Sequence, residues 1–386
     1  MSHNFREYCH QADRAGSTGD FIKLGKLLSL SDIHVKLTQV PENVEAECIR
    51  FVKAPTSDLV VLHLRCIKFL REGRIKDAFE AEAELVRIYT QLLKQQQGNS
   101  ALPILYSVVV DLRRLAFKAG DKKPEEASNL LLQCFRNCTA DNKSSIQDTK
   151  KWGLMSIVNQ LFRIYQLLGN LKMLDALTRA IDSLPFRDSY PASQLVTYNY
   201  FAGKKAMFDA NFEAANEMLS YAFHRCHRAS RRNKRAVLYC LIPVRLLLGY
   251  MPRDSLLEKY NLPEFRELAA ALRSGHLGRF RKVLHTHEKV FHERGIYLIL
   301  EQLHTLVYRN LFKRVFLILK THQLPIDAFT SALKMAGLVD ADNEEAHCLL
   351  ANLICNGRIR GYISWQHDTL VVSKVNAFPP LVQHER

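Results

Sequence analysis

The sequence predicts an all-α, tetratricopeptide-like helical-repeat solenoid that ends in a winged helix with a small β-hairpin. Apolar residues recur at helical spacing along most of the 386-residue chain, and the breaks between helical stretches are short. From about residue 323 the pattern changes to helix, helix and then two short β-segments. This is the order of a winged helix, whose second helix and hairpin meet nucleic acid in DNA-binding members.

The N-terminal half is expected to consist of antiparallel helix pairs stacked on one another. Short breaks such as Gly73, Gly169 and Pro185 separate the apolar stretches. Two stretches, Leu62–Ala83 and Tyr198–Phe223, are similar to tetratricopeptide helix pairs. Helices are expected over Leu59–Leu70, Ile75–Leu93, Leu102–Phe117, Ala127–Phe135, Met155–Leu168 and Leu171–Ile181.

Further helices are expected between this half and the winged helix. The apolar stretch Val237–Leu248 contains Pro243, which predicts a kink or a broken turn. Leu262–Leu272 is a second helix, and one long helix is expected from about Gly295 to Lys320. Because no low-complexity linker follows, we expect the helical part and the winged helix to be one rigid unit.

The first helix of the winged helix is marked by Ile326, Phe329, Leu333 and Met335, and it is expected to stop at Gly337. These apolar residues recur at helical spacing, so one face of the helix is expected to be buried.

The second helix is expected to begin at Asn343 as N-cap, with acids in its first turn, and to end at Gly357. Two β-segments, Ile359–Ser364 and Leu370–Val372, then flank the polar turn Gln366–Asp368. The apolar face of this helix is expected to consist of Ala346, Leu349, Leu350, Leu353 and Ile354. The last four of these residues are expected to form a buried seam.

The net charge of the chain is strongly positive and unevenly distributed. Lys and Arg number 54 against 39 Asp and Glu, which gives a net charge of +15. Residues 221–320 contain 20 Lys and Arg against 7 acids, so most of the excess lies in this part of the chain. A concentrated positive field attracts nucleic acid, an acidic protein or an anionic membrane surface.

Three groups of basic residues are candidate nucleic-acid contacts, because Lys and Arg bind phosphate without reading base sequence. The first lies between two predicted helices, and a nuclear import signal or a solvated turn is the alternative. The second follows the turn Ser274–Phe280. The third flanks the hairpin, where the alternative is that Arg358 and Arg360 only hold the hairpin against the body. The candidates are Arg231, Arg232, Lys234, Arg235, Arg279, Arg281, Lys282, Arg358, Arg360 and Lys374.

Trp365 and His367, at the hairpin turn, are candidate partner-binding residues. A tryptophan at this place stacks on a base, covers the apolar side of the hairpin or contacts a neighbouring subunit. Packing or partner contact is the favoured interpretation.

No pattern in the sequence predicts a metal, a cofactor or a catalytic site. Groups such as His224, Cys226 and His227 do not supply four ligands at paired spacing. The common phosphate-loop, nucleophile-elbow and zinc-protease motifs are missing, so we expect a protein that is not an enzyme. The nine scattered cysteines fit free thiols in a reducing compartment. Neither a bilayer-spanning apolar run nor a secretory signal is recognisable, so no membrane insertion is expected.

One motif points to a family. Residues 352–363 carry the pattern Asn-x-Ile-x-x-Gly-x-Ile-x-Gly-Tyr-Ile, which resembles the end of a PCI domain. This domain occurs in the proteasome lid, the COP9 signalosome, translation initiation factor complexes and the nuclear-pore mRNA-export complex. Five further segments extend the resemblance over essentially the whole chain, to the PCI-domain family of the TREX-II mRNA-export complex. They are Tyr198–Tyr200, Asn211–Glu213, Arg231–Arg235, Gly249–Pro252 and Gly275–Phe280.

The resemblance implies a division into N-terminal helical repeats (residues 1–190), the helical half of a PCI domain (191–322), its winged helix (323–380) and a tail (381–386). It also implies a non-catalytic subunit in the nucleus and at the nuclear pore, and also in the cytoplasm. The implied partners are a large scaffold subunit, a small acidic subunit of the proteasome-lid type, and RNA or DNA. A signalosome-associated paralogue shares the architecture, so a pure scaffold subunit without nucleic-acid binding is the alternative.

Overall fold

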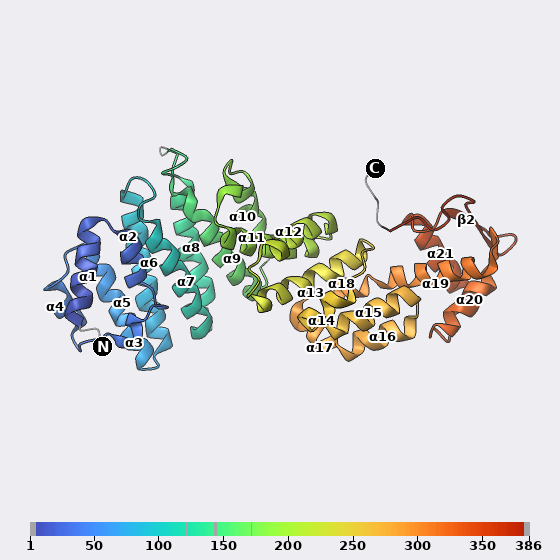
Figure 1. Cartoon of the computed structure of the whole chain (residues 1–386), viewed down its shortest axis with the longest axis horizontal. Coiled ribbons are helices and arrows are strands. Elements are labelled where there is room, and N and C mark those ends of the chain that lie inside the picture. The colour runs from blue at the N-terminus through green and yellow to red at the C-terminus, as the bar shows by residue number, and fades with distance from the viewer. Residues whose placement is uncertain (1–4, 121, 143–144, 171, 382–386) are drawn as a thin grey trace. The chain divides into compact units, whose positions relative to one another are not determined.

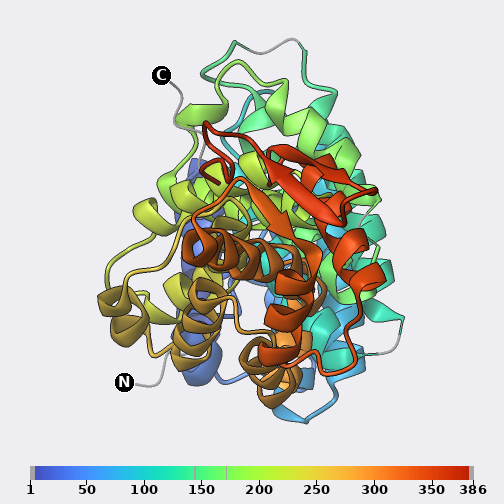
Figure 2. The same cartoon turned by 90° about the vertical axis from the view of Figure 1, so that its right-hand side faces the viewer.

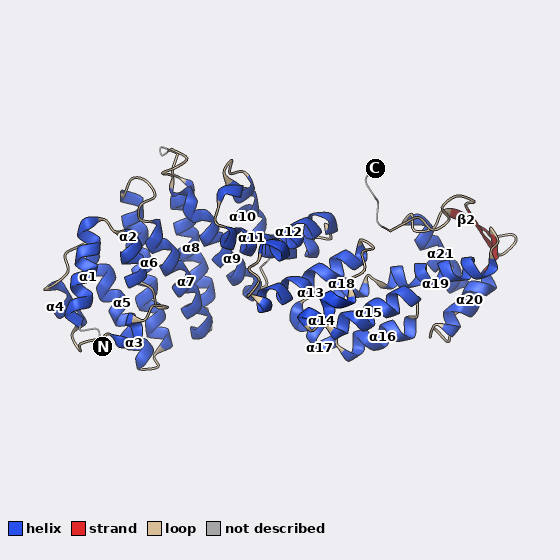
Figure 3. Cartoon of the chain, viewed as in Figure 1, coloured by secondary structure: helices blue, strands red, loops and turns tan. Residues whose placement is uncertain are grey.

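The computed structural model describes residues 5–120, 122–142, 145–170 and 172–381, which are predominantly helical (Figures 1 and 3). The chain divides into two compact units, unit 1 (residues 1–201) and unit 2 (residues 202–386). Leu171, the expected start of one helix, and residues 382–386 of the expected tail lie outside the described residues. The predicted fold class, a helical solenoid with a winged helix, is confirmed.

Unit 1 is a row of helices in which neighbours along the chain pack against each other, as α5, α6, α7 and α8 do in Figure 1. All six helices expected here are present, with ends shifted by a few residues. The elements are α1 (Phe5–Thr18), α2 (Phe21–Leu27), α3 (His34–Leu37), α4 (Val44–Ile49), α5 (Thr56–Arg71), α6 (Ile75–Gln95), α7 (Leu102–Ala119), α8 (Lys123–Thr139), η1 (Lys150–Gly153), α9 (Leu154–Leu168), α10 (Met173–Asp182), η2 (Arg187–Ser189) and the first part of α11 (Ala192–Phe208).

Unit 1 is held together by apolar helix faces, by a buried hydrogen bond and by one close crossing of two helices. In α6 the fully buried side chains include Leu85, Tyr89 and Leu93, which recur every four residues on one helix face. The Tyr89 hydroxyl donates to the Ala101 carbonyl at 2.8 Å, just before α7 begins. Helix α2 approaches α7 so closely that a Cβ on Gly25 would lie 2.6 Å from the Pro103 carbonyl oxygen. Glycine is therefore required at this crossing.

Unit 2 is a helical array followed by the winged helix. Its helices are the rest of α11, α12 (Phe212–Arg225), α13 (Arg231–Leu247), α14 (Asp254–Tyr260), α15 (Pro263–Ser274), α16 (Leu277–Thr286), α17 (Glu288–Arg294), α18 (Tyr297–Glu301), α19 (His304–Leu319), α20 (Ile326–Met335) and α21 (Asn343–Cys355). Its strands are β1 (Gln323–Pro325), β2 (Gly361–Ser364) and β3 (Thr369–Val372).

The winged helix is closed by a small antiparallel sheet in the order β1-β3-β2. The predicted hairpin is present as β2 and β3, which lie against each other as red arrows in Figure 2. The central strand β3 also pairs with β1, where Leu324 lies opposite Leu370, and both side chains are fully buried. The sheet thus ties the start of the winged helix to its end.

Pro243 does not break the helix that contains it, so a broken turn, one of the two outcomes expected there, is wrong. Helix α13 runs unbroken from Arg231 to Leu247 with Pro243 inside it. The side chains on both sides of Pro243 are buried, so tertiary packing outweighs the lost hydrogen bond. The long helix expected from Gly295 to Lys320 is two helices, α18 and α19, with a turn between Glu301 and His304.

The expected details of the winged helix also need correction. Met335 is 86% exposed and does not belong to the apolar face of α20. The N-cap of α21 is Asp342, whose carboxylate accepts from the Glu345 amide at 2.8 Å, so Asn343 is the first helical residue. Of the predicted seam, Leu350 and Leu353 are buried, whereas Leu349 and Ile354 are only half-buried; Ala346 on the same face is also buried. His347 is buried in their place.

Candidate partner and nucleic-acid interface

The hairpin has two ends of different chemistry. The register pairs Gly361 with Val372 and Ser364 with Thr369, so the closed end is the turn from Trp365 to Asp368. At the open end the Ser373 amide donates to the Arg360 carbonyl at 2.8 Å. At ~3.4 Å per residue, the paired strands separate the two ends by roughly 13 Å.

A polar network fixes the closed end to both helices of the winged helix. His347 of α21 bonds through Nε2 to Asp368 Oδ1 at 2.6 Å. Asn343 donates to the Asp327 carboxylate at 2.8 Å and accepts from the Thr330 hydroxyl at 2.7 Å. Because these bonds join α20, α21 and the turn, the position of the hairpin tip is defined by side chains.

The closed end also presents an exposed apolar surface. Trp365 is 75% exposed, and its ring centre lies 4.6 Å from that of His347. Beside the two rings is a shallow hollow of about 460 Å³. Its other lining residues are Glu344, Cys348, Ala351 and Ile363. A large exposed aromatic ring held by a fixed network is the usual chemistry of a protein contact. His367, the second predicted partner-binding residue, lies on the same turn and is exposed.

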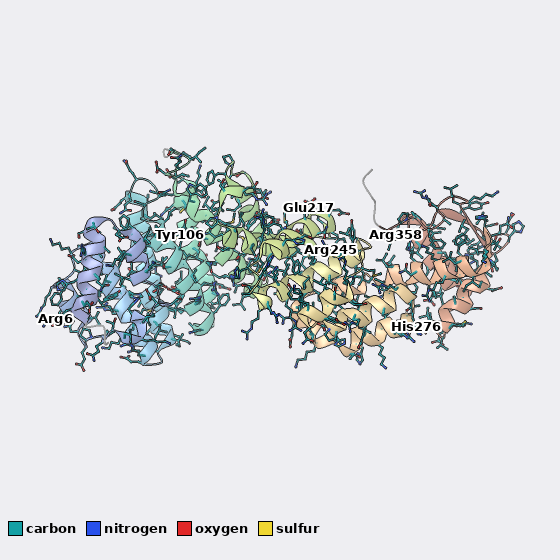
Figure 4. The ribbon with its side chains drawn as sticks, viewed as in Figure 1. Arg6, Tyr106, Glu217, Arg245, His276 and Arg358 are labelled. Atoms are coloured by element: carbon teal, nitrogen blue, oxygen red, sulfur yellow. The ribbon has the colours of Figure 1, made fainter. Side chains whose placement is uncertain are left out.

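The open end is basic. Arg358 is half-buried, and Arg360 and Lys374 are exposed. None of the three forms an ion pair within the described residues (Figure 4 labels Arg358). The acids of the winged helix gather instead at the start of α20, around the start of α21 and at the closed turn. They are Asp327, Asp340, Asp342, Glu344, Glu345 and Asp368. The structure therefore brings the three predicted hairpin cations together and separates them along the chain from these acids.

A buried arginine holds the segment after the hairpin against α19. Arg309 donates to the Pro379 carbonyl at 2.6 Å, and the Arg360 amide donates to the Ala377 carbonyl at 2.9 Å. Burial lowers the pKa of Arg309, and repulsion from Arg358 lowers it further. Arg358 thus lies near a second cation, which adds to the positive field at the open end.

The second predicted group lies on α16, and all three of its residues, Arg279, Arg281 and Lys282, are exposed. The Gly278 amide donates to the Ala336 carbonyl at 2.7 Å, so α16 begins beside the end of α20. The expectation that this group lies near the winged helix is confirmed.

The first predicted group is divided. Arg231 and Arg232 are exposed in the first turn of α13. Lys234 is buried, and its ammonium group donates to the Phe223 carbonyl at 3.0 Å and lies 4.8 Å from the centre of the Phe223 ring. Arg235 donates to the Asn261 carbonyl at 3.1 Å. A wholly solvated turn, one of the alternatives for this group, does not fit Lys234, because its buried side chain connects α12 with α13.

A groove lies between α12, α13 and α14. It has a volume of about 630 Å³ and an apolar floor that includes Phe223, Leu238 and Leu241. Tyr250 is 45% exposed at its edge. Its basic side chains are Arg245, Arg253 and Lys259, and no Asp or Glu lines it. An apolar floor with a basic edge fits a peptide that carries apolar and acidic side chains.

The described residues offer no metal centre, because no three His, Cys, Asp or Glu side chains are placed to hold an ion. Within the same residues, no helix combines the length and apolar character needed to cross a bilayer. Seven of the nine cysteines are buried, and all nine are free thiols.

Sequence reasoning missed His347, Asp368 and Arg309 as functional residues. Each of them acts through a hydrogen bond to a residue distant in the chain. His347 bonds to Asp368, 21 residues away, and Arg309 bonds to Pro379, 70 residues away. The only local signal was His347 on the apolar face of its helix. A histidine that is simply buried and hydrogen-bonded in a protein core produces the same pattern, so the signal does not identify a functional residue.

Helical repeats that lead into a winged helix define a PCI-domain protein, and a family profile described as PCI domain matches residues 284–374. The chain is 41% identical over 396 aligned positions to "PCI domain-containing protein 2" of Xenopus laevis, with 99% of each chain covered. It is 42% identical to "PCI domain-containing protein 2 homolog" of Drosophila melanogaster, covering 92% of this chain and 93% of that one. "Protein CSN12 homolog" of Schizosaccharomyces pombe is 31% identical, with 86% and 84% covered. The chain belongs to the PCI domain-containing protein 2 family.

PCI-domain proteins are subunits of multiprotein complexes, and the family is generally non-catalytic. The predicted family is thereby confirmed at the level of the PCI domain and the relatives named above. The comparisons name no enzyme.

Proposed function

We propose that the chain is a non-catalytic subunit of the TREX-II mRNA-export complex in the nucleus and at the nuclear pore. In this proposal the closed end of the hairpin contacts a large scaffold subunit. The basic residues at the hairpin's open end hold RNA or DNA, and the basic residues of α16 add to the positive charge of the unit. The observation that carries the proposal is the separation of Trp365, with its acidic network, from the unpaired cations Arg358, Arg360 and Lys374.

The charge of unit 2 supports a polyanionic ligand. Phosphate contacts from Lys and Arg need no base recognition, so we expect little sequence preference. The exposed residues Arg231, Arg232, Arg279, Arg281 and Lys282 extend the same field. Lys234 and Arg235 contribute positive charge while they also bond to the protein backbone.

The groove between α12 and α14 is the proposed site of a small acidic subunit. Its apolar floor accepts bulky side chains, and Arg245, Arg253 and Lys259 attract the acids around them. Because such a partner binds only the folded chain, a saturating amount should raise the melting temperature of unit 2. An unchanged melting temperature would refute this pairing.

The second candidate is a scaffold subunit without nucleic-acid binding, in an assembly of the proteasome-lid or signalosome type. The relative named "Protein CSN12 homolog" and the exposed apolar tip favour it. This candidate predicts weak binding to any nucleic acid at physiological salt.

Two sets of variants in the assembled complex test the proposal. The first reverses the charges at the open end: Arg358→Glu, Arg360→Glu and Lys374→Glu. We expect a uniform loss of affinity for a labelled single-stranded oligo(U). The salt slope, which is the slope of the logarithm of the binding constant against the logarithm of the salt concentration, should be shallower by about 2 for three lost phosphate contacts. Binding of the scaffold subunit, measured by co-precipitation, should remain.

The matched variant at the closed end is Trp365→Ser, which should weaken co-precipitation of the scaffold subunit and leave the salt slope unchanged. Unchanged oligo(U) affinity after the triple charge reversal would favour the scaffold-only candidate. Loss of both activities in both variants would show that the two ends do not act separately.

A further inference from the structure

Unit 1 contains a cluster of arginines that the proposed function does not use. Arg113 and Arg114 extend from α7, and Arg163 extends from α9, which packs against α7. Burial lowers the pKa of Arg113 to about 10, and repulsion from Arg163 and Arg114 adds to the shift. Burial and Arg114 also lower the pKa of Arg163. The three positive charges are therefore close enough to repel one another.

Aromatic rings and one amide hold the two central side chains in place. The Arg113 guanidinium carbon lies 5.1 Å from the centre of the Phe117 ring, and that of Arg163 lies 5.4 Å from the Phe201 ring. Arg113 Nε donates to the Gln160 side-chain oxygen at 2.8 Å. A guanidinium stacked on a ring keeps its N–H groups at its edge, where they can bind a ligand.

One acid, Asp111, compensates only part of the charge of this cluster. Asp111 lies 3.5 Å from Arg114, accepts the Leu30 amide at 2.8 Å and is buried. Among the described residues, neither Arg113 nor Arg163 forms an ion pair with an acid. Holding Arg113 and Arg163 close to each other while neither is paired with an acid costs free energy, and a bound anion would recover it.

The arginines are also accessible. Arg113 is half-buried, and Arg163 is exposed overall although neighbouring side chains desolvate part of its guanidinium group, so a ligand can reach both guanidinium edges. Tyr200 lies beside Arg163, and the Tyr200 and Phe201 ring centres are 5.0 Å apart. Forked arginine donors suit phosphate oxygens, and the half-buried Tyr200 ring can stack on an unpaired base, whereas Phe201 is buried and only holds Arg163 in place.

We propose that Arg113 and Arg163 bind the phosphate backbone of a single-stranded nucleic acid. This second contact on unit 1 is separate from the hairpin surface and does not depend on the proposed function. The combination of two arginines with the half-buried Tyr200 ring favours a nucleic acid over an acidic peptide, which would use the arginines but not the ring.

The test compares two double variants of the full chain. In Arg113→Gln/Arg163→Gln the binding of a fluorescent single-stranded oligo(U) of about 15 nucleotides is measured by anisotropy over a salt series. Two lost phosphate contacts predict a salt slope shallower by about 1.4 and an affinity about 25-fold weaker near ~0.1 M salt. The control, Lys172→Gln/Arg179→Gln, removes the same charge at exposed positions next to and within α10 and should leave both values nearly unchanged.

The binding measurements distinguish a nucleic-acid site at Arg113 and Arg163 from an acidic-peptide site and from no site at all. Oligo(U) binding equal to that of the unsubstituted chain would overturn it. Binding of an oligoglutamate peptide that is lost in the Arg113/Arg163 variant, with oligo(U) binding retained, would also overturn it and assign the site to an acidic peptide. Removing like charges should not lower the melting temperature. If the double variant fails to fold, the exposed single substitution Arg163→Gln must still reduce the salt slope by about 0.7.

The hairpin triple variant distinguishes the two proposals. A loss of binding in that variant alone would leave the proposed function standing and refute the unit 1 site. A loss in the Arg113/Arg163 variant alone would do the reverse.

Discussion

Replacing Glu82 by methionine should stabilise unit 1, although it removes a charged residue type from the middle of a helix. Glu82 lies on α6 and is fully buried. Neither of its carboxyl oxygens has a hydrogen-bond partner among the described residues. Burial raises the pKa of Glu82 well above its ordinary value, and the nearby Asp111 raises it further. The folded state therefore favours the neutral acid.

The magnitude follows from the environment of the carboxyl group. Burying a polar group without a hydrogen bond costs ~1–3 kcal/mol in proteins, and methionine has a similar volume without that cost. We expect Glu82→Met to raise the unfolding free energy by about 1–3 kcal/mol at neutral pH. For a unit of this size the melting temperature should rise by about 2–10 °C.

The stabilisation by Glu82→Met should change with pH, and the direction of this change follows from the raised pKa of Glu82. A carboxyl whose folded pKa is raised contributes stability that is present below its unfolded pKa, about 4.3, and is lost as the pH rises through the folded pKa. The gain from Glu82→Met should therefore be larger near ~pH 8 than near ~pH 5. Differential scanning calorimetry at both values measures it.

The control is Glu84→Met on the same helix, which changes an exposed residue. Glu84 pairs with Arg87 at 2.8 Å, a surface contact worth ~0–1 kcal/mol, so no pH-dependent gain is expected. A Glu82→Met variant that melts below the unsubstituted chain, or whose gain does not change with pH, would refute the reasoning.

Three further predictions concern single side chains. Leu353→Ala, at 2% exposure, should cost ~2–5 kcal/mol and weaken nucleic-acid and scaffold binding together, whereas Asn352→Ala should leave thermal melts almost unchanged. Lys234→Ala should lower the melting temperature, because it removes the bond to a backbone carbonyl; an unaltered melt would place the side chain in solvent. Burial and His34 lower the pKa of His63 well below its ordinary value, so stability is present above about pH 6.5 and falls as the unfolded state gains a proton. His63→Leu should flatten the acid side of the melting profile, and an equally steep profile would show that another group titrates.

Much of the fold could be predicted because its signals are local. Apolar spacing marked helices such as α6 and α9, and Gly169 and Gly357 marked helix ends in left-handed backbone conformations. The hairpin followed from two short apolar runs around a polar turn. Strand β1 was missed because three residues, Gln323–Pro325, carry no alternation signal. Its pairing with β3 is a contact between segments distant in the chain.

The candidate site was predictable only in part. The sequence placed Arg358, Arg360 and Lys374 on the flanks of the hairpin and Trp365 at its turn, but it did not reveal that His347 bonds to Asp368 or that Arg309 lies near Arg358. It also could not reveal that Lys234 is buried, because a basic run usually faces solvent. Such facts depend on which distant segments pack together.

In the proposed function the open end of the hairpin touches nucleic acid and the closed end touches protein. Ultraviolet crosslinking of the assembled complex to RNA, followed by mass spectrometry of the crosslinked peptides, measures this directly. We expect RNA-linked peptides that contain residues 356–362 or 373–374, and none that contain only the turn 365–368. Crosslinks at Trp365 or His367 without any at the open end would contradict it.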